Sequence, residues 1–270
     1  NNKNVVIVAS VSCIYGLGDP DEYNDFKIDL CSGLNQNLRD LQRKLVSMQY
    51  VRNEIDLQRG TFRVRGDTLE IIPSDEEYVS RIQFWGDEIE KITIVDNLTG
   101  EVIDKKDKIS IFPAKHWVTS EERMSSAIKD IEVELEDQLK FLKEQNKLLE
   151  LQRLEQRTLF DIDLMKETGT CPGIENYSRH LGRRKEGSPP QTLIDYFPDD
   201  FITFIDESHI TLPQIRAMSS GDFSRKSTLV EYGFRLPSAI DNRPLKFEEF
   251  NEKINQITFV SATPGPHEKE

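Results

Sequence analysis

The sequence is poor in cysteine and has no long apolar run, and both shortages narrow the class of protein. Its 270 residues include three cysteines, Cys13, Cys31 and Cys171, which lie far apart in the chain. Their number and spacing fit neither a disulfide framework nor a zinc site, so we expect a reducing, cytoplasmic compartment. No apolar run approaches the roughly 20 residues that span a bilayer, and there is no signal-peptide pattern, so we expect no membrane partner.

An excess of positive charge is also missing, and so is a phosphate-binding loop. The formal net charge is −13, so any contact with nucleic acid must come from local basic patches. The glycine-rich stretch at residues 15–19 lacks the Lys of the G-x-x-x-x-G-K-[ST] loop that cradles nucleotide phosphates. The chain begins almost directly in an apolar run, without a Met, and stops soon after another. We therefore expect an internal part of a longer protein, with no nucleotide bound to this part alone.

Two apolar runs that end in polar clusters are the most informative feature that is present. Residues 201–209 read FITFIDESH and residues 257–265 read ITFVSATPG. Each is typical of a buried parallel strand that delivers functional groups at its carboxyl end. Adjacent acids such as Asp206 and Glu207 hold a magnesium ion and position a water in phosphoryl-transfer enzymes, although acids are also common at strand ends in general. The succession of DESH and SATPG resembles motifs II and III of the superfamily-2 ATP-driven motors.

The rest of the pattern predicts an α/β chain with an inserted domain. Residues 4–18 predict a buried strand followed by a loop, with Ser10 and Ser12 at the strand end. Residues 21–117 predict a small α+β domain with an antiparallel sheet, a helix near 35–49 and glycine turns after the strands. Residues 191–270 return to a strand, a helix and a strand, which favours a parallel, doubly wound sheet.

Alternation within FRVRGDTLEIIP separates two faces of the predicted sheet. Phe62 and Val64 point inward, whereas Arg63, Arg65 and Glu70 point outward. Outward arginines have two interpretations. They protect an edge strand against aggregation, or they meet a partner.

A long helix and a basic loop separate this domain from the final segment. Residues 119–166 predict an almost uninterrupted helix with one apolar stripe, capped by Thr119 or Ser120. The turn-rich stretch that follows holds the one dense basic cluster of the sequence. It is either a flexible solvated loop or a contact for nucleic-acid phosphates. The cluster consists of Arg179, His180, Arg183, Arg184 and Lys185.

Several longer stretches resemble the UvrB family, the helicase-like damage-verifying subunits of bacterial nucleotide excision repair. They are VASVSCIYGLG, CPGIENYSRHLGRR, FIDESHITLPQIRAM, LVEYGFRLPSAIDNRPLKFEEF and TFVSATPGP. The resemblance implies that residues 1–20 and 191–270 belong to a RecA-like motor domain with a parallel sheet. Residues 21–117 would be the inserted UvrA-binding domain, and residues 118–190 a helical insertion near the DNA path. The phosphate-binding loop, a DNA-gripping β-hairpin, the second motor domain and the partner-binding tail of the family would lie outside this chain.

The resemblance also implies roles for single residues, with ATP and Mg²⁺ as cofactors of the complete protein. Asp206 would hold Mg²⁺, and Glu207 would orient and deprotonate the attacking water. Three further residues would couple the nucleotide to domain movement, namely His209, Ser261 and Thr263. Ser10 and Ser12 would lie near the nucleotide.

Partners follow from the same resemblance, namely UvrA, UvrC and damaged DNA. The positions that would meet UvrA are Arg52, Arg63, Arg65 and Arg81. The positions that would contact DNA are Arg179, Arg183, Arg184 and Lys185. Two alternatives stay open at this point: the UvrA-docking region of a transcription-repair coupling factor, and an interaction module without catalysis.

Overall fold

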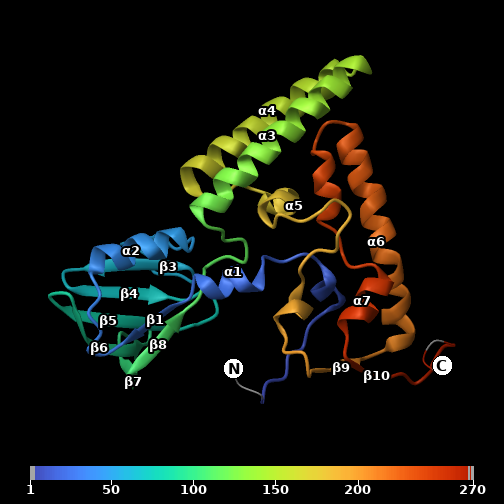
Figure 1. The fold of residues 1–270 in the computed structure, drawn as a ribbon. Coiled ribbons are helices and arrows are strands. Elements are labelled where there is room, and N and C mark those ends of the chain that lie inside the picture. The colour runs from blue at the N-terminus through green and yellow to red at the C-terminus, as the bar shows by residue number, and fades with distance from the viewer. Residues whose placement is uncertain (1–3, 267, 269–270) are drawn as a thin grey trace. The chain divides into compact units, whose positions relative to one another are not determined.

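The computed structural model describes residues 4–266 and residue 268, and the chain folds into two compact units (Figure 1). The sheet unit runs from Asp21 to Val118. The motif unit holds the residues up to Pro20 together with those from Thr119 onward. Each unit has an apolar core of its own. Among the described residues, no helix is long and apolar enough to cross a membrane.

The sheet unit is built on six strands in the order β2-β3-β4-β5-β6-β7. Neighbouring strands are antiparallel, except that β2 and β3 run parallel. Gly66 (φ +59°) and Gly86 (φ +63°) make two of the hairpin turns, because glycine adopts positive φ at little cost. The predicted antiparallel sheet is therefore present. Its strands are β2 Val51–Arg52, β3 Thr61–Arg65, β4 Thr68–Ile72, β5 Val79–Trp85, β6 Glu88–Val95 and β7 Val102–Lys106.

Helix α2 (Leu38–Ser47) packs its apolar side on one face of this sheet (Figure 1). The Asn37 side chain caps the helix by accepting hydrogen bonds from the main-chain N–H groups of Arg39 and Asp40. Leu41 and Leu45 are buried in the same core as the inward side chains of β3, β4, β5 and β6. The unit also contains a short helix and a separate antiparallel strand pair: α1 Pro20–Asp25, β1 Ile28–Cys31 and β8 Lys108–Ile111.

The prediction of one long helix over residues 119–166 is wrong, because the segment is a helical hairpin. Helix α3 (Glu121–Glu144) and helix α4 (Leu148–Thr168) pack side by side (Figure 1). Asn146 adopts a left-handed conformation (φ +57°) between them, which ends α3 and reverses the chain. Ser120 caps α3, as expected, and Gly169 (φ +71°) ends α4.

The last part of the motif unit contains two parallel strands and a long helix. Strand β9 (Ile202–Ile205) pairs in parallel with β10 (Gln256–Phe259), and α6 (Ser208–Glu231) connects them together with later elements. Ile205, Leu212, Ile215 and Leu245 form the core beneath this crossover. The remaining elements are η1 Val11–Ile14, η2 Ile174–Tyr177, α5 Ser178–Leu181, η3 Leu193–Tyr196, η4 Pro237–Asp241 and α7 Phe247–Lys253.

The expected buried strand at the start of the chain is absent. The apolar side chains from Val5 to Val8 are exposed, and the strand pairs of the described residues do not include this segment. An apolar run forms a buried strand only where a neighbour supplies hydrogen bonds and side chains cover both faces. The turn that follows, η1, is packed against the rest of the unit, because its Ile14 is buried in the same core as Ile205.

Candidate functional site

The parallel pairing of β9 and β10 brings the DESH and SATPG segments to the same edge of the strands. The last paired residues, Ile205 and Phe259, lie directly opposite each other. The Val260 N–H then donates a hydrogen bond to the Ile205 carbonyl (2.9 Å), and the Ser208 N–H donates to the Val260 carbonyl (3.1 Å). Residues more than fifty positions apart in sequence therefore form one site at the carboxyl ends of the strands.

Both acids of DESH are exposed, and the basic side chain beside them in the described structure is His209, next to Glu207. Asp206 and Glu207 are exposed, and within the described part of the chain neither forms an ion pair with a Lys or an Arg. The Glu207 N–H donates to Asp206 Oδ1 (3.0 Å), which orients the Asp206 carboxylate. Glu207 itself adopts the left-handed conformation (φ +45°) at the start of α6. Such backbone strain in a residue other than glycine is concentrated at functional sites.

One side-chain contact joins the two motifs directly. Ser261 Oγ lies 2.8 Å from His209 Nδ1, within hydrogen-bonding distance. Ser261 Oγ also accepts a hydrogen bond from the Thr263 N–H (3.1 Å), and Glu207 Oε2 lies 3.4 Å from His209 Nδ1. The contacts form a chain from Glu207 through His209 to the SAT turn.

The two exposed carboxylates fit a divalent cation as partial ligands. Oxygen ligands suit Mg²⁺, which usually takes one or two protein carboxylates and completes its shell with phosphate oxygens and water. In the described part of the chain, no group of three or more His, Cys, Asp or Glu side chains could hold a metal by itself. A cation held by these two carboxylates would need further ligands.

Ser10 and Ser12 lie before and within η1. Their hydroxyls contact each other at 2.5 Å, and Ser10 is exposed. The same turn carries the buried Ile14 into the core that supports β9. No contact in the described structure joins either hydroxyl to Asp206 or Glu207, so a place near the nucleotide stays a prediction for them.

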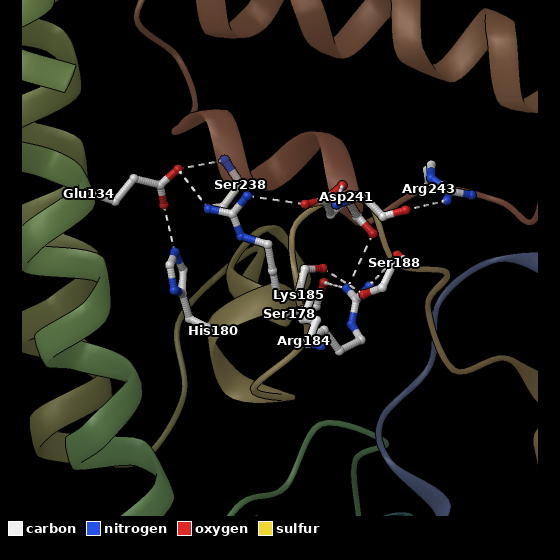
Figure 2. A network of polar contacts seen from close by, with 11 residues as sticks. Glu134, Ser178, His180, Arg184, Lys185, Ser188, Ser238, Asp241 and Arg243 are labelled. Carbon is white, nitrogen blue, oxygen red and sulfur yellow. Dashed lines mark hydrogen bonds and ion pairs between the residues drawn. The ribbon is translucent and has the colours of Figure 1, made fainter. Parts of the chain in front are cut away.

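The basic cluster is not a solvated loop, because two of its arginines are turned inward. Figure 2 shows Glu134 of α3 facing His180 and the N-terminal end of η4 at Ser238. Glu134 accepts hydrogen bonds from the Ser238 N–H (2.7 Å) and from Arg179 Nη2 (3.5 Å), and its other oxygen lies 2.6 Å from His180 Nε2. Arg179 also donates to Asp241 Oδ2 (3.1 Å). Burial alone would raise the pKa of Glu134, but hydrogen bonds from His180 and Ser238 lower it below its ordinary value.

Arg184 is likewise used inside the motif unit (Figure 2). Its guanidinium donates hydrogen bonds to the Ser188 carbonyl (3.0 Å), to Ser178 Oγ (3.2 Å) and to the Asp241 carbonyl (3.2 Å). Burial lowers its pKa from the ordinary value. Of the four predicted DNA contacts, Arg183 and Lys185 are exposed, whereas Arg179 and Arg184 are partly buried.

The sequence interpretation missed Glu134 and Asp241, the acids that neutralise this cluster. Glu134 lies beside Leu135 on the buried side of α3, and an acid in an apolar stripe signals a paired site. Asp241 gives no comparable signal, because its partners come from a segment some sixty positions away.

The arginines predicted to meet UvrA lie on the sheet unit, and each contacts Glu70 or Glu54. Arg63 Nε donates to Glu70 Oε2 (2.6 Å), and Arg81 Nε donates to Glu70 Oε1 (2.7 Å). Arg52 Nε donates to Glu54 Oε1 (2.6 Å), and Arg65 Nη2 donates to the Glu54 carbonyl (3.3 Å).

The expected outward position of Glu70 needs correction. Glu70 lies on the predicted face, but it is buried because Arg63 and Arg81 cover it from the two neighbouring strands. Burial would raise the pKa of Glu70, whereas the hydrogen bonds from both arginines lower it below its ordinary value. Alternation along one strand identifies a face, but it does not reveal which side chains of adjacent strands cover each other.

Comparisons with known proteins agree with this architecture. Residues 28–117 match the model of the UvrB interaction domain, and residues 122–183 match the UvrB third helical domain. The chain is 60% identical to UvrABC system protein B of Bacillus licheniformis and of Geobacillus kaustophilus, and 58% identical to that of Bacillus subtilis. Each match covers 99% of this chain and 41% of the relative. With both domain models matched and the likeness extending over nearly every residue, the chain belongs to the UvrB family.

Proposed function

We propose that this chain is the central part of the helicase-like subunit of a bacterial excinuclease, a cytoplasmic protein of nucleotide excision repair. We assign residues 1–20 and 191–270 to a RecA-like motor domain, 21–117 to a UvrA-binding domain, and 118–190 to a helical insertion near DNA. The observation that carries the proposal is the contact of His209 with Ser261, which joins the two motor motifs at adjacent strand ends. The family match favours this interpretation over a transcription-repair coupling factor.

ATP hydrolysis is the chemistry that we propose for the site at the carboxyl ends of β9 and β10. A nucleotide with Mg²⁺, bound in the complete protein, would supply the phosphoryl group and neutralise its charge. Asp206 would be the carboxylate that holds the ion, and Glu207 would orient water and accept its proton. His209, Ser261 and Thr263 would relay the state of the site between the two strands. The complete protein would use this step to test DNA for damage before UvrC makes the incision.

Docking to UvrA is the role that we propose for the sheet unit. Arg63 and Arg81 lie in one row across three strands, and Lys105 lies further along the row through Thr93. A basic face on a chain of net charge −13 stands out from its surroundings. Such a face speeds association with an acidic partner and loses this advantage in salt.

Reversing the charge of Arg65 tests this docking role. Arg65 is exposed, and its guanidinium donates a hydrogen bond to the main-chain carbonyl of Glu54, so Arg65→Glu should leave the melting temperature nearly unchanged. We expect slower association with UvrA and a loss of about 1 kcal/mol at a rim position, or several if the pair is desolvated. Binding kinetics beside a thermal melt make the measurement. Arg39→Glu, an exposed change of equal charge on α2, is the control. Unchanged UvrA binding by Arg65→Glu would exclude this contact.

A second experiment concerns DNA. Because only Arg183 and Lys185 of the basic cluster are exposed, we expect their joint reversal to Glu in the complete protein to weaken DNA binding. The slope of log K against log salt should flatten by about 0.9 for each phosphate of duplex DNA that the variant no longer neutralises. Arg43 and Lys44, exposed neighbours on α2, give a control pair with the same change of charge. Equal salt slopes for the wild type and the Arg183/Lys185 variant would show that these side chains do not contact DNA phosphates.

A further inference from the structure

Three adjacent strands place an arginine, a glutamate and an arginine directly opposite one another. Arg63 of β3 pairs in register with Glu70 of β4, and Glu70 pairs with Arg81 of β5. Each oxygen of the one carboxylate accepts a hydrogen bond from the Nε of a different arginine, at 2.6 and 2.7 Å. Among the described residues, Glu70 is the only hydrogen-bond acceptor of either side chain. The terminal nitrogens therefore keep donor capacity for an external ligand.

The exposure of the three side chains shows that the two arginines cover the carboxylate between them. Glu70 is 9% exposed, Arg63 18% and Arg81 30%. A long arginine side chain in water samples many rotamers, and binding must stop that motion at a cost in affinity. Here the carboxylate already restricts both guanidinium groups. Arg52 is restricted in the same way by Glu54, at a more exposed position.

We propose that Glu70 is a positioning residue for partner binding, which holds Arg63 and Arg81 ready to receive carboxylates of an acidic protein surface. This inference rests on the proposed docking of the sheet unit to UvrA and adds that Glu70 holds two of the docking arginines in place. A protein is favoured over a nucleic acid, because the matched domain is an interaction domain and because Trp85, 80% exposed, ends the strand that carries Arg81. Tryptophan and arginine are the residues most enriched at the energetic centres of protein interfaces.

The substitution Glu70→Gln separates positioning from simple charge, because the two effects have opposite signs. Removing one negative charge from a basic face speeds association with an acidic partner and tightens binding if charge alone matters. If Glu70 positions the arginines, the same substitution weakens binding to UvrA. We expect a loss of about tenfold in affinity, the order of effect when two long side chains must be ordered on binding. The loss should appear as faster dissociation, with an association rate equal to or above that of the wild type.

Two further variants keep the test decisive. Glu77→Gln removes the same charge from an exposed pair with Arg59, and it should leave UvrA affinity unchanged or slightly raised. Glu54→Gln removes the negative charge that Arg52 contacts at an exposed site where folding is not at risk, and it should weaken binding about twofold. Each variant of the 270-residue chain is melted before use, and if Glu70→Gln does not fold, Glu54→Gln carries the test.

The outcomes are distinct. Weaker binding by Glu70→Gln and Glu54→Gln, with normal binding by Glu77→Gln, supports the proposal. Binding of Glu70→Gln that equals or exceeds the wild type overturns it, as does an effect on duplex DNA binding in place of UvrA binding. A wild-type chain that does not bind UvrA would instead refute the proposed docking function, so the two failures are recognised separately.

Discussion

Replacing Glu207 with Gln in the complete protein is expected to preserve ATP binding and to lower the rate of hydrolysis by about 10²-fold or more. The amide keeps the shape of the side chain and its place at the start of α6, but it cannot accept a proton from water. Asp206 is unchanged by the substitution, so the carboxylate proposed to hold Mg²⁺ stays available. A nucleotide titration and a steady-state measurement of phosphate release check the two parts of this expectation separately.

The position of Glu207 makes the substitution a clean one. Glu207 is exposed and makes no ion pair with Lys or Arg among the described residues, so its loss costs little folding energy. Asp200→Asn is the matched control, because Asp200 is an exposed acid at the opposite end of β9 and should leave hydrolysis intact. Wild-type hydrolysis by Glu207→Gln would refute the assignment of the base. Loss of ATP binding would mean that Glu207 contributes to the nucleotide site in another way.

The sequence predicted the hairpin turns and the polar strand ends, because each depends on residues that are close together in the chain. Gly66 and Gly86 sit at hairpin turns because only glycine adopts positive φ there without strain. The polar ends of β9 and β10 meet because parallel strands that neighbour each other end at one edge of a sheet. The side-chain contact between His209 and Ser261 joins them.

Features that depend on distant residues were not predictable from one sequence. Asn146 is a weak helix former that tolerates the left-handed conformation, but one Asn within a long helical pattern does not reveal that α4 turns back and packs on α3. Arg179 and Arg184 read as a solvated cluster until Glu134 and Asp241 are brought beside them by the fold. The hydrophobicity of Val6 and its neighbours predicts a buried strand, but burial also needs an adjacent strand. The sequence of this segment does not show whether such a strand is present, and Val6 is exposed.

The contacts of Glu134 predict a large loss of folding stability in the motif unit when its charge is removed. This carboxylate is 14% exposed and joins α3 to α5 and to η4 through His180, Arg179 and Ser238. Glu134→Gln removes the charge that Arg179 faces and weakens the hydrogen bonds that the Glu134 carboxylate accepts. We expect the free energy of unfolding at pH 7 to fall by about 2 to 4 kcal/mol. Glu136→Gln, at an exposed position on the same helix, should change it by less than about 0.5 kcal/mol.

The pH dependence of this loss identifies the charge as its cause. The pKa of Glu134 is lowered by folding, so its charge stabilises the folded unit above the ordinary value of 4.5 and stops doing so as pH falls through the lower folded value. The gap in stability between the wild type and Glu134→Gln should therefore be full at pH 7 and shrink below about pH 4.5. Urea unfolding followed by helical circular dichroism reports the motif unit, which holds the long helices α3, α4 and α6. Both tryptophans, Trp85 and Trp117, lie in the sheet unit, so their fluorescence should show an unchanged transition. A stability gap that stays constant from pH 7 to below pH 4 would assign the loss to packing and not to the carboxylate charge.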